Sequence, residues 1–560
     1  MNAVTAPVDT DVPITGRRRT VALIVVLLAY FLDLLDNTIV NVALPPIQRE
    51  LGAPLSSVQW VAGGYALTFA IVLITGSRLG DIFGRRRLFL IGVAGFIAAS
   101  ALCGTAYGAN QLIAYRLVQG AFAALMVPQV LATIQVMYPP AQRGKAIAAF
   151  GGLAGLATVG GPILGALLTS GDIGGLGWRS IFYVNVPIGL LALAAAYFAL
   201  PESHAPQAER LDILGVVLSS VALFLLVYPL IQGREAGWPL WTYGCVAASV
   251  AVFVVFFAYQ RHRAATVGSP LIELRLFRLR TFDGGLLTAA LFFGGVIGFF
   301  MTMTLYFQIG LGYSVLRAGL TGLPWGMAVP MFAGVSAGLL VPKIGRAALQ
   351  LGLVLYLTGL VGLIWTVSHF GPHVTSTQFI VPLLIGGIGM GLVVAPLVDF
   401  SLTDVPIQDA GSASGLFNTT QQLASAIGIA ALGTVFFGLL GTQAAPALSH
   451  IQPQVHAELT AADIPPDAQD QIFAQFGACF TDRVRASDPE TEPASCRAAG
   501  PQSAPPSPAI ERAMGTAAST AMADDFGRSF QRTLWVVIGT GALALLASFW
   551  LPRRPTHHEG

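Results

Sequence analysis

The chain has 560 residues, of which 54% are hydrophobic and only 10% are charged. In water-soluble globular proteins about a quarter of the residues are charged, so this composition excludes a soluble protein and favours one whose exterior faces lipid. The formal net charge of +2 gives no support to nucleic-acid binding. We therefore expect an all-α polytopic membrane protein that contacts membrane lipids and no nucleic acid.

Fourteen apolar segments are about 20 residues long or longer, which is enough to cross a hydrocarbon core of about 30 Å. The first is too long for the apolar core of a cleaved signal peptide, so we expect it to remain as a membrane helix. The expected membrane helices are 20–44, 57–80, 87–106, 109–137, 145–170, 179–200, 211–231, 241–260, 282–307, 315–341, 347–368, 376–402, 411–440 and 530–551.

The basic residues predict the orientation of these helices, because Lys and Arg concentrate in cytoplasmic loops. They cluster at 17–19, at 85–87 and between 261 and 280, which all lie on one side of the membrane. If that side is the cytoplasm, both termini are cytoplasmic, and the number of spans must be even.

The order of the spans predicts two six-helix bundles with two extra helices between them, an arrangement typical of secondary transporters with a central site. The segment 261–281 is basic and amphipathic, and it either lies along the inner membrane surface or forms a solvated linker. The expected parts are a cytoplasmic tail at 1–19, a first bundle at 20–200, linker helices at 201–260, the amphipathic linker at 261–281, a second bundle at 282–440 and 530–551, a long outer loop at 441–529 and a cytoplasmic tail at 552–560.

The sequence also limits the energy source. It contains no GxxxxGK[ST] phosphate-binding loop, so any pumping must use an ion gradient. The eight histidines show no zinc-binding spacing, and we expect neither a metal nor a cofactor. Residues 334–338 match the GxSxG motif of hydrolases, but they lie inside a long apolar helix, where small residues permit close packing. We expect no enzymatic activity.

Charges inside the membrane are costly and therefore indicate functional sites. Asp33 and Asp36 are three residues apart, on one face of the first span, and Arg116 lies in the fourth. At about 1.5 Å per residue, Asp36 and Arg116 fall at similar depths and can meet. A carboxylate whose access and partner change with conformation can carry protons across the membrane. The alternatives are a static Asp36–Arg116 ion pair and, for Asp33, either cation binding or a second proton site.

Other polar residues within the spans are candidates for binding substrate in a central cavity, as Asp33 is. Asp399 lies near the inner end of its span, where it either contacts substrate or extends to the membrane surface. The remaining candidates are Asn37, Asn41 and Gln119.

Three motifs carry a family resemblance. GSRLGDIFGRRR at residues 76–87 is similar to the GxLaDrxGrrx signature of the major facilitator superfamily. LDNTIVNVALP at residues 35–45 resembles a motif of its fourteen-helix drug:proton antiporters, and RLVQG at residues 116–120 resembles their RxxQG motif. The resemblance covers nearly the full chain except the long outer loop, and it implies proton-coupled alternating access.

The same resemblance implies an inner gate at the loop after the second span. Gly84 permits a tight turn, while Asp81 pairs with a nearby arginine, Arg85, and Arg86 belongs to the same signature. This latch breaks and reforms as the inner side opens and closes. A simple positive anchor at the membrane surface is the alternative.

The fifth span contains Gly161, Pro162 and Gly165 in a GPILG string that resembles the antiporter motif GxxxGPxxGG. In the family this motif separates exporters from importers, whereas generic close packing of helices is the alternative interpretation. The string WRSIFYVNVP at residues 178–187 is also typical of the subfamily, and we interpret it as structural.

The outer loop contains Cys479 and Cys496, and an extracytoplasmic location permits a disulfide between them. The loop itself is a lid, a docking surface or a tolerated insertion.

These observations lead to one functional hypothesis and two alternatives. We expect a monomeric exporter in a bacterial plasma membrane that exchanges protons for small amphipathic drugs or antibiotics, including cationic ones. The first alternative is a dedicated exporter of a single self-made metabolite, antibiotic or lipid. The second is a receptor or scaffold that transports nothing, and the charges within the membrane argue against it.

Overall fold

The regular elements of the described part of the chain are all helices, and 13 of them are long and apolar enough to cross a membrane. The structure is a computed structural model. It describes residues 16–138, 153, 157, 160–203, 211–233, 236–266, 271, 274–405, 410–485, 493–498 and 508–553.

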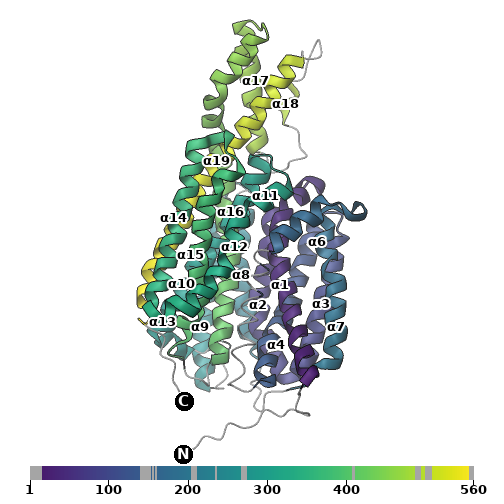
Figure 1. Ribbon diagram of the computed structural model, residues 1–560, viewed down its shortest axis with the longest axis vertical. Helices are drawn as coiled ribbons and strands as arrows, with labels where there is room; N and C mark the ends of the chain where they lie inside the picture. The colour runs from purple at the N-terminus through teal and green to yellow at the C-terminus, as the bar shows by residue number, and fades with distance from the viewer. Residues whose placement is uncertain are drawn as a thin grey trace, which may run out of the picture.

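Two helical bundles stand side by side, the first in purple and blue and the second in teal, green and yellow (Figure 1). The expected span at 145–170 lies mostly outside the described residues, and the helix Gly160–Ser170 is its described part. The first bundle consists of α1 (Gly16–Glu50), α2 (Leu55–Phe83), α3 (Arg85–Gly104), α4 (Ala109–Met137), the helix Gly160–Ser170, α6 (Ser180–Tyr183) and α7 (Asn185–Ala199).

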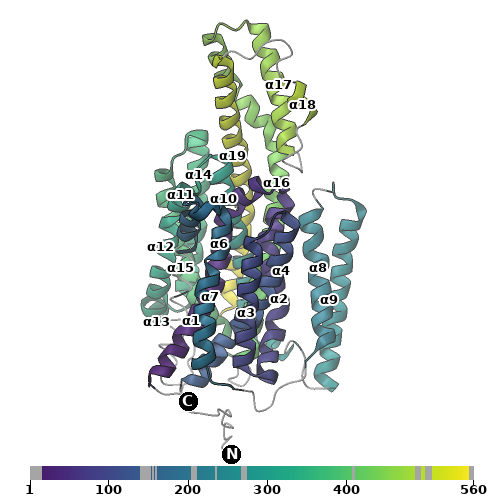
Figure 2. The same ribbon diagram turned by 90° about the vertical axis from the view of Figure 1, so that its right-hand side faces the viewer.

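Between the bundles, the chain forms a hairpin of α8 (Ile213–Gln232) and α9 (Leu240–Thr266), which stands at the side of the molecule (Figure 2). Only α8 of this pair packs closely on the bundles, against α2 and α16. The expected amphipathic linker at 261–281 is partly a continuation of α9, and a short helix at Leu274–Arg278 precedes the second bundle.

The second bundle contains two interrupted spans. The segment expected as one helix at 315–341 is broken near Gly322 and continues through a π-helical stretch, and another π-helical stretch, η4, ends the span before it. Its elements are α10 (Arg280–Leu305), η4 (Tyr306–Gly310), α11 (Val315–Thr321), α12 (Leu323–Val335), η5 (Ser336–Leu340), α13 (Val341–Ile344), α14 (Arg346–Phe370), η6 (Gly371–His373), η7 (Ser376–Phe379), α15 (Ile380–Leu402), α16 (Ala410–Ala461), α19 (Pro508–Ala547) and η9 (Ser548–Trp550).

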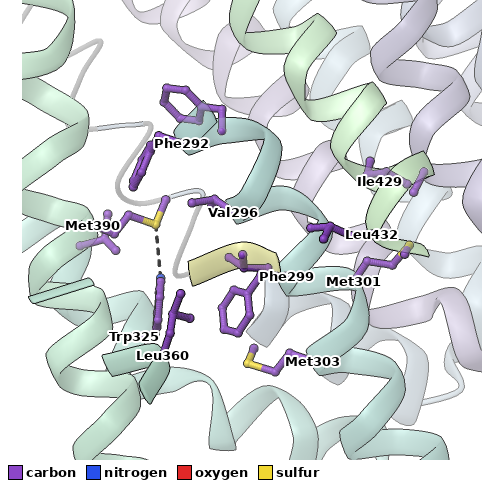
Figure 3. Close-up of a cluster of buried hydrophobic side chains, with 14 of the residues drawn as sticks. Phe292, Val296, Phe299, Met301, Met303, Trp325, Leu360, Met390, Ile429 and Leu432 are labelled. Atoms are coloured by element: carbon purple, nitrogen blue, oxygen red, sulfur yellow. Dashed lines mark hydrogen bonds between the residues drawn. The ribbon is translucent and has the colours of Figure 1, made fainter. Parts of the chain in front are cut away.

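The core of the second bundle is apolar and aromatic (Figure 3). Trp325 lies between Phe299, at a ring distance of 5.2 Å, and Tyr356, at 6.0 Å. Its indole nitrogen donates to the sulfur of Met390 at 3.4 Å. Ring stacking and methionine contacts of this kind stabilise a core without charge.

A helical protrusion extends beyond one end of the bundles (Figure 1). The sequence predicted a loop at 441–529, but α16 continues to Ala461 and α19 begins at Pro508, with α17 (Pro466–Arg485) and α18 (Ala494–Ala498) between them. The hydropathy that defines a membrane span ends near 440, whereas a helical stripe of apolar residues continues beyond it. That stripe is Ala444, Leu448, Ile451, Val455 and Leu459, and it packs with Phe480, Ala513, Ala517 and Ala521.

We call the end of the molecule that carries the protrusion the outer end, and the opposite end the inner end. The start of α1 is at the inner end, where Arg18 Nε donates to the carbonyl of Ala199 at 3.2 Å. The last described residues are there too, because the amide of Arg346 donates to the carbonyl of Arg553 at 3.0 Å. The two described chain ends and the clustered arginines therefore share one end (Figure 1).

Candidate functional site

A buried ion pair joins α1 to α4 inside the first bundle. Arg116 donates through a terminal guanidinium nitrogen to the Asp36 carboxylate, and the two side chains are 1% and 0% exposed. The Arg116 Nε donates to the backbone carbonyl of Val61 on α2 at 3.1 Å. Such a pair is stable away from water only when its remaining hydrogen-bonding groups are also satisfied.

Neutral polar groups form many of these remaining hydrogen bonds. The second oxygen of Asp36 accepts from Gln119 Nε2 and from Asn185 Nδ2, each at 2.9 Å. Gln119 Oε1 accepts from Arg116 at 2.7 Å, and Asn185 also donates to Ser100 Oγ at 3.1 Å. Helices α1, α3, α4 and α7 thus each contribute to one connected cluster around the Asp36 carboxylate.

Asp33 belongs to the same cluster. It is 2% exposed, and its carboxylate accepts from the Tyr65 hydroxyl of α2 at 2.5 Å. The Tyr65 ring in turn lies against Arg116, with the guanidinium carbon 4.3 Å from the ring centre. The Asp33 and Asp36 carboxylates are therefore connected through Tyr65 and Arg116, which places two acids beside one buried positive charge.

Three members of this cluster were not predicted from the sequence: Tyr65, Ser100 and Asn185. Asn185 lies in the string that we interpreted as structural, and its amide within an apolar segment was a usable signal. Tyr65 and Ser100 gave no such signal, because a lone hydroxyl in an apolar helix commonly bonds within its own helix.

The candidate substrate residues occupy different places. Asn37 and Asn41 follow Asp33 at one-turn spacing, and their amides donate to the carbonyls four residues earlier, at 3.1 and 3.0 Å. Gln119 is fully buried in the Asp36 cluster. Asp399 is exposed near the inner end of α15, away from that cluster. A polar line at Asp33, Asn37 and Asn41 is therefore the best candidate for substrate contact on α1.

The predicted gate loop lies between α2 and α3. Gly84 has φ of 106°, a backbone conformation that favours glycine. Arg85 donates to Asp81 at 2.8 Å, one helical turn away, and the amide of Arg86 donates to Glu202 at 3.1 Å. In this conformation, these contacts tie the loop to the end of its own bundle.

The glycines of the fifth span lie directly against α1. A Cβ on Gly161 would be 1.9 Å from Thr38 Oγ1, and one on Gly165 would be 2.9 Å from a side-chain carbon of Ile39. The Thr38 hydroxyl donates to the carbonyl of Ala157 at 3.2 Å. The Pro162 carbonyl is 3.2 Å from where a Cβ on Gly319 would stand, in the second bundle. The motif therefore allows close helix packing within two residues of Asp36.

Two remaining sequence features lie apart from the cluster. Ser336, in the middle of the GxSxG match, is fully buried and donates to the carbonyl of Leu392 at 3.1 Å, so it packs two helices together. Cys479 and Cys496 are joined by a disulfide in the protrusion. Among the described residues, no group of three His, Cys, Asp or Glu side chains could hold a metal ion.

Comparison with known proteins identifies the family. The profile of the Major Facilitator Superfamily matches residues 26–429. The chain is 41% identical over 543 residues to a protein of Streptomyces coelicolor named "Probable actinorhodin transporter", covering 97% of this chain and 93% of that protein. It is 36% identical to the "Tetracenomycin C resistance and export protein" of Streptomyces glaucescens, covering 73% of this chain and 74% of that protein.

Among solved structures, a bacterial homologue of the human lysosomal transporter Spinster shares the fold. The TM-score is 0.59, and the match covers 96% of this chain and 98% of that one. At 17% identity, this likeness concerns the fold alone. The profile match and the named relatives show more: the chain is a multi-pass plasma-membrane transporter of the major facilitator superfamily, of the drug- and antibiotic-exporter type.

Proposed function

We propose that this protein exports amphipathic drugs or antibiotics in exchange for protons, by alternating access between its two bundles. The observation that carries the proposal is the fully buried Asp36–Arg116 pair with its shell of hydrogen bonds. A charge cluster inside a membrane bundle is expensive, and its retention favours a working role over a structural one. The proposed topology has fourteen spans with both termini in the cytoplasm.

In the proposed cycle, Asp36 carries its negative charge while it is paired with Arg116. A proton that reaches Asp36 from outside neutralises the carboxylate and leaves the Arg116 charge without its main partner. Arg116 then depends more on Gln119, the Val61 carbonyl and the Tyr65 ring. That imbalance favours a different packing of α1 and α4, from which the proton leaves on the cytoplasmic side.

Asp33 has the geometry for a second role in the same cycle. When Asp36 is protonated, Arg116 can compensate the charge of Asp33 through Tyr65, which contacts both. When Arg116 returns to Asp36, Asp33 is free to take a proton or a cationic group of the substrate. The carboxylate and the amides of Asn37 and Asn41 follow one line along α1, which suits an amphipathic substrate.

The proposed inner gate uses the loop with Asp81 and Arg85. In the present conformation their ion pair is internal to the first bundle. Closure of the inner end would require Asp81 to exchange this partner for groups of the second bundle, and Gly84 gives the turn the freedom to follow.

Transport by purified protein in proteoliposomes with an imposed proton gradient tests the proposal. We expect wild type to move a cationic dye uphill and Asp36→Asn to lose uphill movement while keeping downhill exchange. Glu50→Gln is the matched control, because Glu50 ends the same helix in an exposed ion pair with Arg179. Uphill export by Asp36→Asn at the wild-type rate would refute the coupling role.

The names of the relatives favour a second candidate on the same fold. Both Streptomyces proteins are named for one antibiotic each, and one of them matches nearly the whole of this chain. A dedicated exporter of a single metabolite would accept one compound or a few close relatives of it and reject unrelated cationic dyes. A panel that includes actinorhodin, tetracenomycin C and cationic dyes separates the candidates. If Asp33 binds cationic substrates, Asp33→Asn should slow the export of cationic compounds and leave the export of neutral ones unchanged.

A further inference from the structure

A further buried acid lies in the second bundle, on α19. Asp525 is fully buried, and neither of its carboxylate oxygens has a hydrogen-bond partner among the described residues. Its neighbour Asp524 differs, because Arg528 Nε donates to it at 2.7 Å and His450 Nδ1 of α16 lies 3.6 Å from it. The two adjacent acids therefore differ: Asp524 forms an ion pair with Arg528, whereas the Asp525 carboxylate has no hydrogen-bond partner in the described ranges.

Within the residues that the structure describes, Asp525 has no ion pair like that of Asp524, and the polar groups considered around it are hydroxyls. Ser529, one turn along α19, is fully buried, and its hydroxyl has no hydrogen-bond partner in the described part of the chain. The same is true of the Tyr306 hydroxyl of η4, whose ring stacks on Phe530 at 5.0 Å. An ionised carboxylate in such a place carries a large desolvation cost, whereas a neutral carboxyl carries little. In this conformation Asp525 therefore holds its proton.

Asp525 lies where α19 leaves the membrane. About 33 Å of helix separates it from the inner end of α19 at Ala547, and a hydrocarbon core is about 30 Å thick. Water at the outer surface is therefore close to Asp525, and only the packing of neighbouring helices excludes it. The elements that pack on α19 include α10, η4, α14, η6 and α16, and η4 lies against Phe526.

One of these elements makes a contact between the two bundles. Gln308 in η4 donates to the carbonyl of Val42 on α1 at 2.8 Å. The same element packs tightly on α19, because a Cβ on Gly310 would be 2.6 Å from the Cβ of Phe526. π-Helical stretches such as η4 occur often at functional sites. The element that packs on Phe526, the neighbour of Asp525 in the chain, therefore also makes an outer contact between the bundles.

We propose that Asp525 is a proton-binding site that controls closure of the outer end. The protonated carboxyl is stable in the closed arrangement, in which η4 holds α1 through Gln308 and Val42. When the outer end opens, water reaches Asp525 and its proton leaves to the outside. Closure requires a proton to return from the same side, so the outer end closes only when protons are available there to load Asp36.

This control carries no proton across the membrane, because Asp525 exchanges with one side only. The proposal deepens the proposed antiport and rests on it for its purpose, but its test does not depend on transport. Other charged or titratable groups also lie on α19 and the elements packed against it. They include Asp524 and Arg528 on α19, Tyr306 on η4, Asp283 on α10, His450 on α16, His369 on α14 and His373 in η6.

The test measures the outer opening directly. Spin labels on cysteines introduced at the exposed positions Asn110 and Thr377 report the distance between the outer ends of the two bundles, in a Cys245→Ser background. The protein is the full chain in lipid nanodiscs, without substrate or gradient, between pH 5 and pH 8. It also carries Asp33→Asn and Asp36→Asn, so that neither acid of the first cluster contributes to the pH dependence.

We expect the parent protein to shift to longer distances as the pH rises. Asp525→Asn, which mimics the protonated acid, should remain at the short distance throughout. The matched controls Asp524→Asn and His450→Gln should keep the shift. A parent without a shift, or an unchanged shift in Asp525→Asn, would overturn the proposal. Uphill export by Asp36→Asn would instead refute the proton-coupling assignment, so the two failures are distinguishable.

A second measurement needs no substitution at Asp525. Dicyclohexylcarbodiimide modifies protonated carboxyls in apolar surroundings, and mass spectrometry of the labelled wild type distinguishes Asp525 from Asp524. We expect modification of Asp525 that decreases as the pH rises, with little modification of Asp524. Equal modification of the two acids, or none at Asp525 at low pH, would contradict the proposal even if Asp525→Asn does not fold.

Discussion

The two bundles share a helical design but differ in what lies at their centres. In the first, Asp36, Arg116 and Asp33 are all at most 2% exposed, and amides and hydroxyls surround them. In the second, the centre is a stack of rings around Trp325, with a sulfur as the acceptor of its indole N–H (Figure 3). The centre of the second bundle shows that this architecture packs well around a core without charge.

That difference bears on the role of the ion pair. Replacing a buried ion pair with apolar side chains is often neutral or stabilising, so a buried pair is weak support for a purely structural role. The shared architecture of the bundles strengthens this argument, because the second bundle of the same molecule packs its centre with apolar side chains. We interpret the first bundle as the element that carries protons across the membrane, whereas the second supplies an apolar core and, at its outer end, the one-sided proton site at Asp525.

The largest expected effect follows from separating the buried pair. Arg116→Leu leaves Asp36 buried without its cation, so we expect a loss of about 3–5 kcal/mol in the free energy of unfolding. Asp36→Leu combined with Arg116→Leu should recover much of that stability while uphill export remains absent. Thermal unfolding in detergent and proteoliposome transport measure the two properties. Export by the double variant would show that the pair only joins the helices.

A substitution at the centre of the second bundle should lower stability without changing proton coupling. Trp325→Ala removes the ring at the centre of the stack, and we expect the free energy of unfolding to fall by about 3 kcal/mol. The number of protons exchanged per substrate should not change in the molecules that remain folded. Proton and substrate fluxes in the same proteoliposomes give this ratio, and a changed ratio would contradict the division of roles between the bundles.

Much of this comparison could be predicted from the sequence. The composition and apolar segments predicted an all-helical membrane protein, and two charged positions at similar depth predicted the meeting of Asp36 with Arg116. The aromatic core of the second bundle could not be predicted, because many helices supply its residues and apolar segments do not reveal their facing. Asp525 was missed for another reason: the hydropathy of α19 begins only near 530, which placed this acid in an expected outer loop.

The close contact between the fifth span and α1 gives a smaller test within the first bundle. Gly161→Ala would drive a Cβ into Thr38, so we expect a loss of about 1–3 kcal/mol and slower export. Gly160→Ala is the matched control, because a Cβ there meets nothing within 4 Å among the described residues. Turnover and thermal unfolding of the two variants measure the difference. Equal behaviour of the two would remove the packing role from this motif.

The smallest expected effect concerns the linker between the bundles, at the inner start of α8. Asp212 caps this helix by accepting from the amide of Gly215 at 3.0 Å, and it accepts from Gln260 at 2.7 Å and Tyr259 at 2.9 Å on α9. Burial acts to raise the pKa of the Asp212 carboxyl, but these bonds and the charge of Arg263 outweigh burial, so its pKa lies below the ordinary value. The ionised form therefore fastens the α8–α9 hairpin at its base.

The sign of the pH dependence follows from that lowered pKa. The stabilisation by Asp212 is complete above the ordinary carboxyl pKa of about 3.9 and is lost as the pH falls through the lower value in the folded protein. Asp212→Asn keeps an oxygen that can cap the helix but loses the charge that strengthens the bonds from Gln260 and Tyr259. It should lower the free energy of unfolding by about 1 kcal/mol at neutral pH, with the difference from wild type shrinking in acid. Thermal unfolding between pH 3 and pH 7 measures it, with the exposed Asp404→Asn as control. Because α9 packs on the molecule mainly through α8, loss of the Asp212 charge should destabilise the hairpin and leave export unchanged. A lower proton-to-substrate ratio in Asp212→Asn would instead show that the linker takes part in coupling the bundles.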